Sequence, residues 1–92
     1  MVVYCEMEII IPMAQSLKEK RNLLKSLQNK LKNQFNIAIS EIDKNEIWKS
    51  SVLGIVSVSK DRVYLEKITT DIINFVDQFY GVEISTYNIE YF

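Results

Sequence analysis

The side chains best placed to do chemistry are Lys20 and Glu41, which both fall where the pattern of apolar residues points toward a protein interior. A buried ammonium beside a carboxylate could act as an acid–base pair in an enzyme. The two groups could instead neutralise each other, because buried charges are usually paired. Alternatively, Lys20 could snorkel, with its stem over Leu24 and its ammonium in water. The sequence leaves these three readings open.

The chain lacks most residue types and motifs that other catalytic or metal-binding sites need. The chain has no histidine, which excludes histidine acid–base catalysis and the usual zinc sites. Its one cysteine, Cys5, alternates with Val3 and Met7, so we expect a buried, inert thiol without a disulfide or iron–sulfur cluster. No glycine-rich loop offers a phosphate cradle. We therefore predict a protein that is not an enzyme and holds no cofactor or metal.

A basic segment stands out against a nearly neutral chain. The whole chain has a net charge of −1, but the stretch from Ser16 to Asn33 carries six cations against Glu19 alone, so it is +5 and the rest is −6. On a helix, four of the cations form a ridge within about 60°. This basic ridge comprises Lys18, Arg21, Lys25 and Lys32. It is either a solvated face or a site for RNA phosphate or an acidic protein surface, with Lys20 as a further candidate.

Hydrophobic periodicity predicts the six elements that would position these residues. Period-two alternation indicates strands at 2–11 and 35–42, and a stretch that is apolar on both faces favours a central strand at 47–59. A fourth strand is expected at 82–92, and helical spacing indicates helices at 16–33 and 60–80. Pro12 should end the first strand. Ser16 and Glu19 form a capping box, Ser59 is a plausible N-cap of the second helix, and Gly81 suits its left-handed C′ position.

The order β-α-β-β-α-β is that of an α+β, ferredoxin-like sandwich. Right-handed crossovers would place both helices on one face of a four-stranded antiparallel sheet with strand order 4-1-3-2. The start of the first helix then lies at the end of the second strand, which brings Lys20 near Glu41. We expect one domain spanning 1–92.

Aromatic residues suggest that the protein associates with copies of itself. An apolar edge strand and an uncovered sheet face both invite another chain. Trp48 either caps the core or anchors a partner. A homo-oligomer, most simply a two-fold dimer, is therefore expected. The candidate interface residues are Tyr4, Trp48, Tyr87, Ile89 and Tyr91.

The chain shows no membrane-spanning or secretory pattern. No apolar run approaches the roughly 20 residues of a membrane span, and no cationic segment precedes a cleavage site. With a single cysteine, a reducing compartment is the simplest expectation. We therefore expect a cytoplasmic protein.

Several stretches resemble the YlxP-like family of small uncharacterised bacterial proteins. They are IIIPMAQSLKEKRNLLKSL, FNIAISEID, IWKSSVLGIVSVS and IEYF, and the most specific part is SLKEKR at Ser16–Arg21, followed by Glu41 and Trp48. The resemblance implies a ferredoxin-like fold, in agreement with the periodicity. Members of this family are commonly encoded beside translation initiation factor two and ribosome-binding factor A, which implies a link to ribosome maturation or translation. The family has no established activity and no agreed catalytic residues.

Together these observations favour a non-enzymatic binding or accessory protein that touches ribosomal RNA or a translation factor through the basic ridge. The alternative is a regulatory domain that holds a small anionic ligand at a dimer interface, with Lys20 and Arg21 as its cations. An enzyme using Lys20 and Glu41 is the weakest reading.

Overall fold

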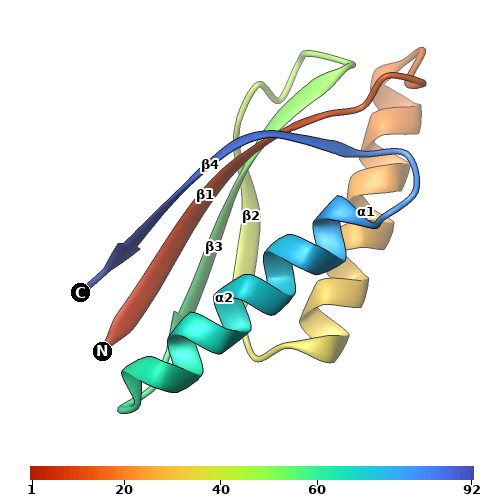
Figure 1. The fold of residues 1–92 in the computed structure, drawn as a ribbon. Coiled ribbons are helices and arrows are strands. Elements are labelled where there is room, and N and C mark those ends of the chain that lie inside the picture. The colour runs from red at the N-terminus through yellow and green to blue at the C-terminus, as the bar shows by residue number, and fades with distance from the viewer.

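The computed structural model describes all residues, 1–92, and contains the six predicted elements in the predicted order (Figure 1). Their bounds follow the periodicity closely, with differences of a few residues at the ends. The elements are β1 (Val2–Ile10), α1 (Leu17–Gln34), β2 (Ala38–Asp43), β3 (Ser50–Val58), α2 (Arg62–Asp77) and β4 (Glu83–Tyr91).

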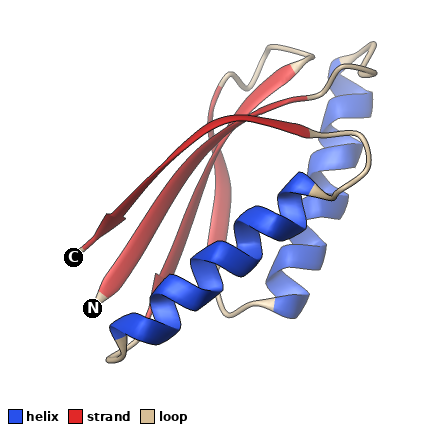
Figure 2. Ribbon diagram, viewed as in Figure 1, coloured by secondary structure: helices blue, strands red, loops and turns tan.

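The four strands form one antiparallel sheet with the order β2-β3-β1-β4, which is the predicted order read from the other edge. Both helices lie on one face of the sheet, so the ferredoxin-like fold is confirmed (Figure 2). The core fills the space between helices and sheet. It is built mainly from Val3, Cys5, Met7 and Ile9 of β1, Leu53 and Ile55 of β3, Leu24, Leu27 and Leu31 of α1, and Leu65, Ile68, Ile72 and Val76 of α2.

Helix α1 begins as the capping pattern predicts. Ser16 is the N-cap, and its hydroxyl accepts a hydrogen bond from the Glu19 amide at 3.1 Å. The Glu19 carboxylate reaches back to the amide of Gln15 at 3.2 Å, one residue earlier than in the standard capping box. Two amide donors at the helix start are therefore satisfied by side chains.

The predicted ends of α2 were wrong by two or three residues. Asp61, not Ser59, is the N-cap, because its carboxylate accepts from the Val63 amide at 2.9 Å, while the Ser59 hydroxyl accepts from the Asp61 amide. The helix ends at Asp77, before Gly81. Gly81 does adopt the left-handed conformation (φ +97°), but in the following loop and not at C′.

Strand β3 begins at Ser50, so the prediction that the strand includes Ile47 and Trp48 was wrong; both residues lie in the loop before it. The loop turns at Lys44, a non-glycine residue with φ of 60°. The Ile47 amide donates to the Lys44 carbonyl at 3.1 Å, which closes the turn. This β2–β3 loop, residues 44–49, is the segment against which the start of α1 packs.

The two ends of the chain pair with each other. The Val2 amide donates to the Phe92 carbonyl at 2.8 Å, and the Phe92 amide donates to the Val2 carbonyl at 2.7 Å. Both termini lie at one end of the sheet, and the β2–β3 loop lies at the other end (Figure 1).

Candidate functional site

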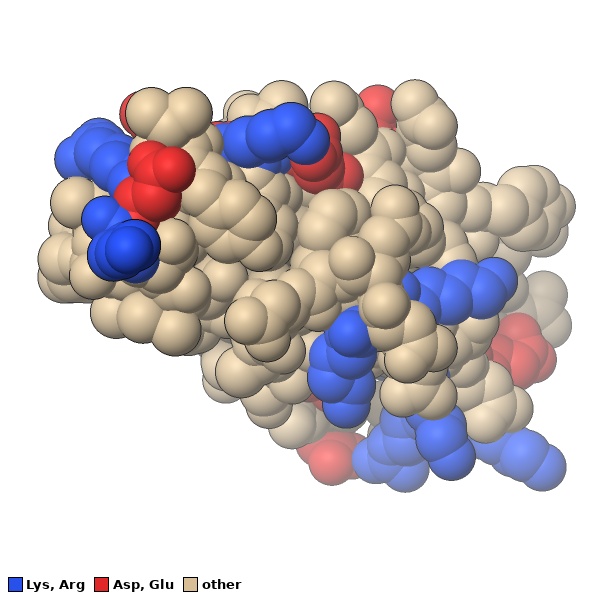
Figure 3. Space-filling view, turned by 90° about the horizontal axis from the view of Figure 1, so that it is seen from below, with Lys and Arg blue, Asp and Glu red and all other residues tan.

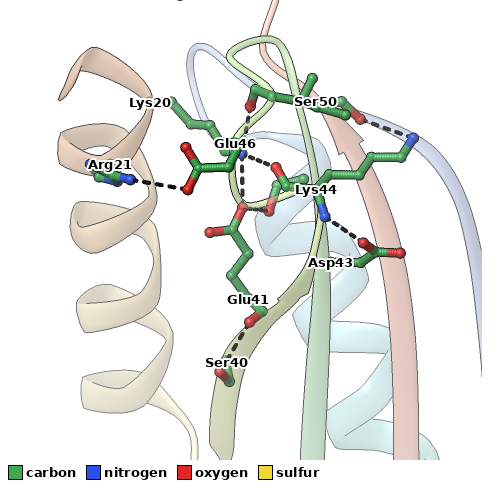
Figure 4. A network of polar contacts seen from close by, with 10 residues as sticks. Lys20, Arg21, Ser40, Glu41, Asp43, Lys44, Glu46 and Ser50 are labelled. Carbon is green, nitrogen blue, oxygen red and sulfur yellow. Dashed lines mark hydrogen bonds and ion pairs between the residues drawn. The ribbon is translucent and has the colours of Figure 1, made fainter. Parts of the chain in front are cut away.

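Lys20 is the most buried charged residue of the protein, with no exposed surface. Its ammonium lies 2.9 Å from Glu41 Oε2, so the predicted Lys20–Glu41 pair is present and snorkelling is not. It also donates to the backbone carbonyls of Lys44 and Ile47, each at 2.6 Å (Figure 4). An ammonium has three hydrogens to donate, and the three acceptors match that number.

Glu41 is held from a second side. The Ser51 hydroxyl on β3 donates to Glu41 Oε2 at 2.6 Å, so this oxygen accepts from both the ammonium and the hydroxyl. No buried side-chain nitrogen or oxygen lacks a partner. The network therefore joins α1, β2, β3 and the β2–β3 loop, and its geometry suits a structural clamp.

The burial of Lys20 corrects one sequence prediction. Lys20 was a candidate anion-binding residue, both for the ridge and for a ligand at a dimer interface. Its side chain is fully enclosed and its three donors are used, so no ligand can reach it. Its partner Glu41 is less enclosed, with a side chain that is 17% exposed.

The basic ridge is exposed along its whole length. Lys18, Arg21, Lys25 and Lys32 are all exposed on α1, and Lys and Arg side chains gather on the side of the molecule where α1 lies (Figure 3). The ridge faces away from α2, because Lys30 on the other flank lies 5.3 Å over the ring of Phe79, just after α2.

Only one ridge residue has an acidic partner. Arg21 Nη2 lies 3.9 Å from Glu46 Oε1 in the β2–β3 loop (Figure 4). Both side chains are largely exposed, 61% for Arg21 and 82% for Glu46, so the pair is weak. The ridge thus starts beside the loop and leads away from it along α1.

The β2–β3 loop, which contacts Arg21 of the ridge through Glu46, exposes two large apolar side chains. Ile47 is 49% exposed and Trp48 is 50% exposed. Trp48 therefore does not close the core, which was one of its two predicted roles. The other role, as an anchor for a partner, remains a prediction.

The uncovered face of the sheet is part apolar and part acidic. A Cβ at Gly54 would lie 3.1 Å from Ile42 Cγ2 and 3.3 Å from Tyr4, so these two side chains converge over the glycine. Burial raises the pKa of the Tyr4 phenol, and the nearby Glu6 carboxylate adds to the effect. Further along, Lys44 pairs with Glu8. These charged groups border a shallow hollow of about 410 Å³, lined by Glu6, Glu8, Asp43, Lys44, Val52, Thr86, Tyr87 and Asn88.

The candidate interface residues do not form one surface. Tyr87, Ile89 and Tyr91 pair in register with Met7, Cys5 and Val3, whose side chains face the helices. Ile89 and Tyr91 pack against the core, and the Arg62 guanidinium lies 4.3 Å over the Tyr91 ring. Tyr87 is 48% exposed at the sheet edge, while Tyr4 lies on the opposite, uncovered face.

The remaining features are the single cysteine, the absence of a metal-binding cluster and the character of the helices. Cys5 is buried, and burial raises the pKa of its thiol to about 11, which makes the thiolate scarce at neutral pH. No group of three or more histidine, cysteine or acidic side chains is arranged to hold a metal ion. Neither helix is long and apolar enough to cross a membrane.

Sequence reasoning found the pair but missed its other members. The carbonyls of Lys44 and Ile47 have no sequence signal, because every residue carries a carbonyl. Ser51 could have been found, because it lies two residues before the inward Leu53 and so shares its face. The contact of Arg21 with Glu46 depends on the loop turning back over α1.

Comparisons with known proteins agree with the fold and the resemblance. Residues 2–89 match a family model described as "Protein of unknown function (DUF503)". The chain is 39% identical over 92 residues to "Uncharacterized protein YlxP" of Bacillus subtilis (strain 168), with all of both chains covered. Among solved structures, the designed protein Foldit4 is similar with a TM-score of 0.61 and 16% identity, covering 100% of this chain and 99% of that one. The protein YJCS is similar with a TM-score of 0.56 and 13% identity, over the same shares.

Proposed function

The chain belongs to the YlxP-like family (DUF503), and from that premise we propose that it is a non-enzymatic, cytoplasmic accessory protein that binds RNA phosphates through the basic ridge. The observation that carries the proposal is the one-sided charge of α1. The ridge offers four exposed cations, of which only Arg21 has an acidic partner. The link of the family to translation genes makes ribosomal RNA the favoured partner.

The spacing of the ridge suits a polyanion. Its four cations span 15 residues of α1, from Lys18 to Lys32, so the ridge is about 21 Å long. If all four neutralise phosphates of a single strand, the slope of log K against log salt would be about −2.8. Affinity would then fall about 50-fold between roughly 50 and 200 mM salt.

The test measures binding of fluorescently labelled single-stranded RNA by anisotropy at these two salt concentrations. The variant Lys25→Glu/Lys32→Glu should weaken binding and flatten the slope by about 1.4. The control variant Lys60→Glu/Lys67→Glu has the same net charge but changes exposed lysines outside α1. Absence of binding at low salt, or equal losses in both variants, would reject the proposal. Co-sedimentation with ribosomal subunits would then show whether ribosomal RNA is the partner.

A second candidate function follows from the uncovered sheet face. We propose, as the alternative, a regulatory domain that forms a homo-oligomer and holds a small ligand in the hollow bordered by Glu8 and Lys44. The support is the hollow itself, together with the exposed apolar residues Ile42 and Val56 on the same face of the sheet. Light scattering would measure the mass in solution, and a thermal-shift screen with metabolites would find a ligand. A monomer without any shift would reject this alternative.

A further inference from the structure

We propose that the β2–β3 loop and the start of the basic ridge form one binding surface for single-stranded RNA, in which Trp48 stacks on a base and Arg21 takes an adjacent phosphate in place of Glu46. The inference rests on the proposed function and deepens it, because it names the form of RNA and the residues that read it. Three features of the molecule support it.

The first feature is the fixed position of the loop. The buried Lys20 ammonium holds the carbonyls of Lys44 and Ile47, each at 2.6 Å, and Ile47 directly precedes Trp48. The backbone that carries the indole is therefore tied to α1 beside Arg21. An aromatic ring on a fixed support loses little conformational freedom when a partner binds.

The second feature is the closeness of the loop that carries Trp48 to the ridge. Arg21 lies 3.9 Å from Glu46, and Glu46 is two residues before Trp48. The Cα atoms of these two loop residues are therefore no more than about 7.6 Å apart. Proteins that bind single strands combine a cationic track for the backbone with aromatic rings for the bases. Here the half-exposed ring belongs to the same short loop that contacts the cationic track through Glu46.

The third feature is the Glu46 carboxylate, which pairs with the Arg21 guanidinium. The Glu46 side chain is 82% exposed and lies at the outer limit of an ion pair, so it is a weak and replaceable partner. A phosphate can accept two parallel hydrogen bonds from a guanidinium. In RNA it also belongs to a strand whose other phosphates contact the rest of the ridge. Glu46 thus marks an anion position and competes with RNA for it.

The RNA must be single-stranded for this arrangement to work. Bases in a duplex are covered by their neighbours, whereas unpaired bases in loops and ends can stack on an aromatic side chain. A ridge acting by charge alone would not make this distinction. Preference for single strands therefore separates stacking on Trp48 from attraction to phosphate.

Because Trp48 is the only tryptophan, its fluorescence reports on this surface alone. We would titrate the protein with single-stranded RNA of about 12 nucleotides and with a duplex of equal length, following tryptophan emission and the anisotropy of labelled RNA. We expect quenching by the single strand only. Trp48→Ala should weaken binding about 5- to 150-fold without changing the salt slope, and Trp48→Phe should restore part of the loss. Tyr64→Ala, which removes a 42%-exposed aromatic residue of α2, is the control and should have no effect.

Removal of the competing carboxylate gives a gain-of-function test. Glu46→Gln should tighten RNA binding about 2- to 5-fold. Glu66→Gln is the matched control, because Glu66 also pairs weakly with an arginine, Arg62 at 3.7 Å, but on α2. The control should change affinity much less, although the net charge changes equally.

The outcomes separate the inference from the function on which it rests. Salt-dependent RNA binding with unchanged tryptophan emission and wild-type affinity of Trp48→Ala would overturn the inference and leave the proposed function standing. Equal quenching by polyglutamate would also overturn it, because an acidic peptide has no bases to stack. Absence of RNA binding at low salt would overturn both.

Discussion

Replacing Lys20 by methionine should destabilise the protein more than almost any other single change to a charged residue. The substitution keeps a long apolar stem but removes an ammonium that is bound within 2.9 Å by three acceptors. Glu41 would remain partly buried without its cation, and the carbonyls of Lys44 and Ile47 would lose their donor. Breaking a buried pair from one side costs about 3–5 kcal/mol.

This cost is a large share of the stability expected for a small domain. A loss of that size would lower the melting temperature by at least about 12 °C. Urea unfolding followed by circular dichroism measures the free energy directly. Lys18→Met is the matched control, because Lys18 is exposed on the same helix, and it should stay within about 0.5 kcal/mol of wild type.

A double-mutant cycle would isolate the pair itself. Combining Lys20→Met with Glu41→Gln should cost less than the two single losses added together, with a coupling of about 1–3 kcal/mol. If Lys20→Met unfolds at the same urea concentration as Lys18→Met, the ammonium does not hold the network and the structural clamp is refuted. Loss of stability without coupling would show that the backbone carbonyls, and not Glu41, are its important partners.

Three further changes have measurable outcomes. Gly81→Ala should lower the free energy of unfolding by about 1–2 kcal/mol, because φ is +97° there while the nearest Leu23 atom leaves ordinary space at 3.4 Å; an unchanged value in urea would contradict this reason. Asp61→Ala should cost about 0.5–2 kcal/mol through loss of the bond to the Val63 amide, measured by thermal unfolding, and Asp61→Asn should retain most of it. Burial raises the pKa of Cys5 from 9.0 to about 11, so the folded state binds its thiol proton more tightly than the unfolded state, and stability should decline as pH rises from 9 to 11. Cys5→Ala should remove that part of the decline, and identical pH profiles for the two proteins would contradict it.

The sequence was sufficient for the fold because few arrangements satisfy its element order. Alternation in β1, the continuous apolar run of β3 and helical spacing in α1 and α2 identify the elements, and the handedness of crossovers then determines the sheet order. The same topology predicts that Lys20 meets Glu41, because the start of α1 and the end of β2 lie at one end of the sheet. A long-range contact was thus predictable without any knowledge of side-chain positions.

The ends of the helices and strands were harder to predict, because tertiary contacts override the intrinsic preferences of the residues. Ile47 and Trp48 have strand-forming side chains, yet Lys20 takes the carbonyl of Ile47 and the turn at Lys44 keeps both residues out of β3. Ser59 and Asp61 are both good caps, and only the backbone path decides between them.

The faces of β4 were hidden for a different reason. Register with β1 shifts between Glu8 and Ile9, where a bulge interrupts simple alternation. The bulge puts Ile84 on the same face as Ile89 and Tyr91, which pair with Cys5 and Val3 and face the helices, although an edge strand rich in apolar residues suggests a surface for another chain. The pairing partner, and not the strand's own sequence, decides which way its side chains point.

The pairing of Val2 with Phe92 has a practical consequence for protein engineering. Since the two ends meet through hydrogen bonds of 2.8 and 2.7 Å, a short linker could join them with little change to the sheet. An affinity tag or fluorescent reporter attached at either natural end would stand at the opposite end of the sheet from the β2–β3 loop, so immobilised protein would leave that loop accessible.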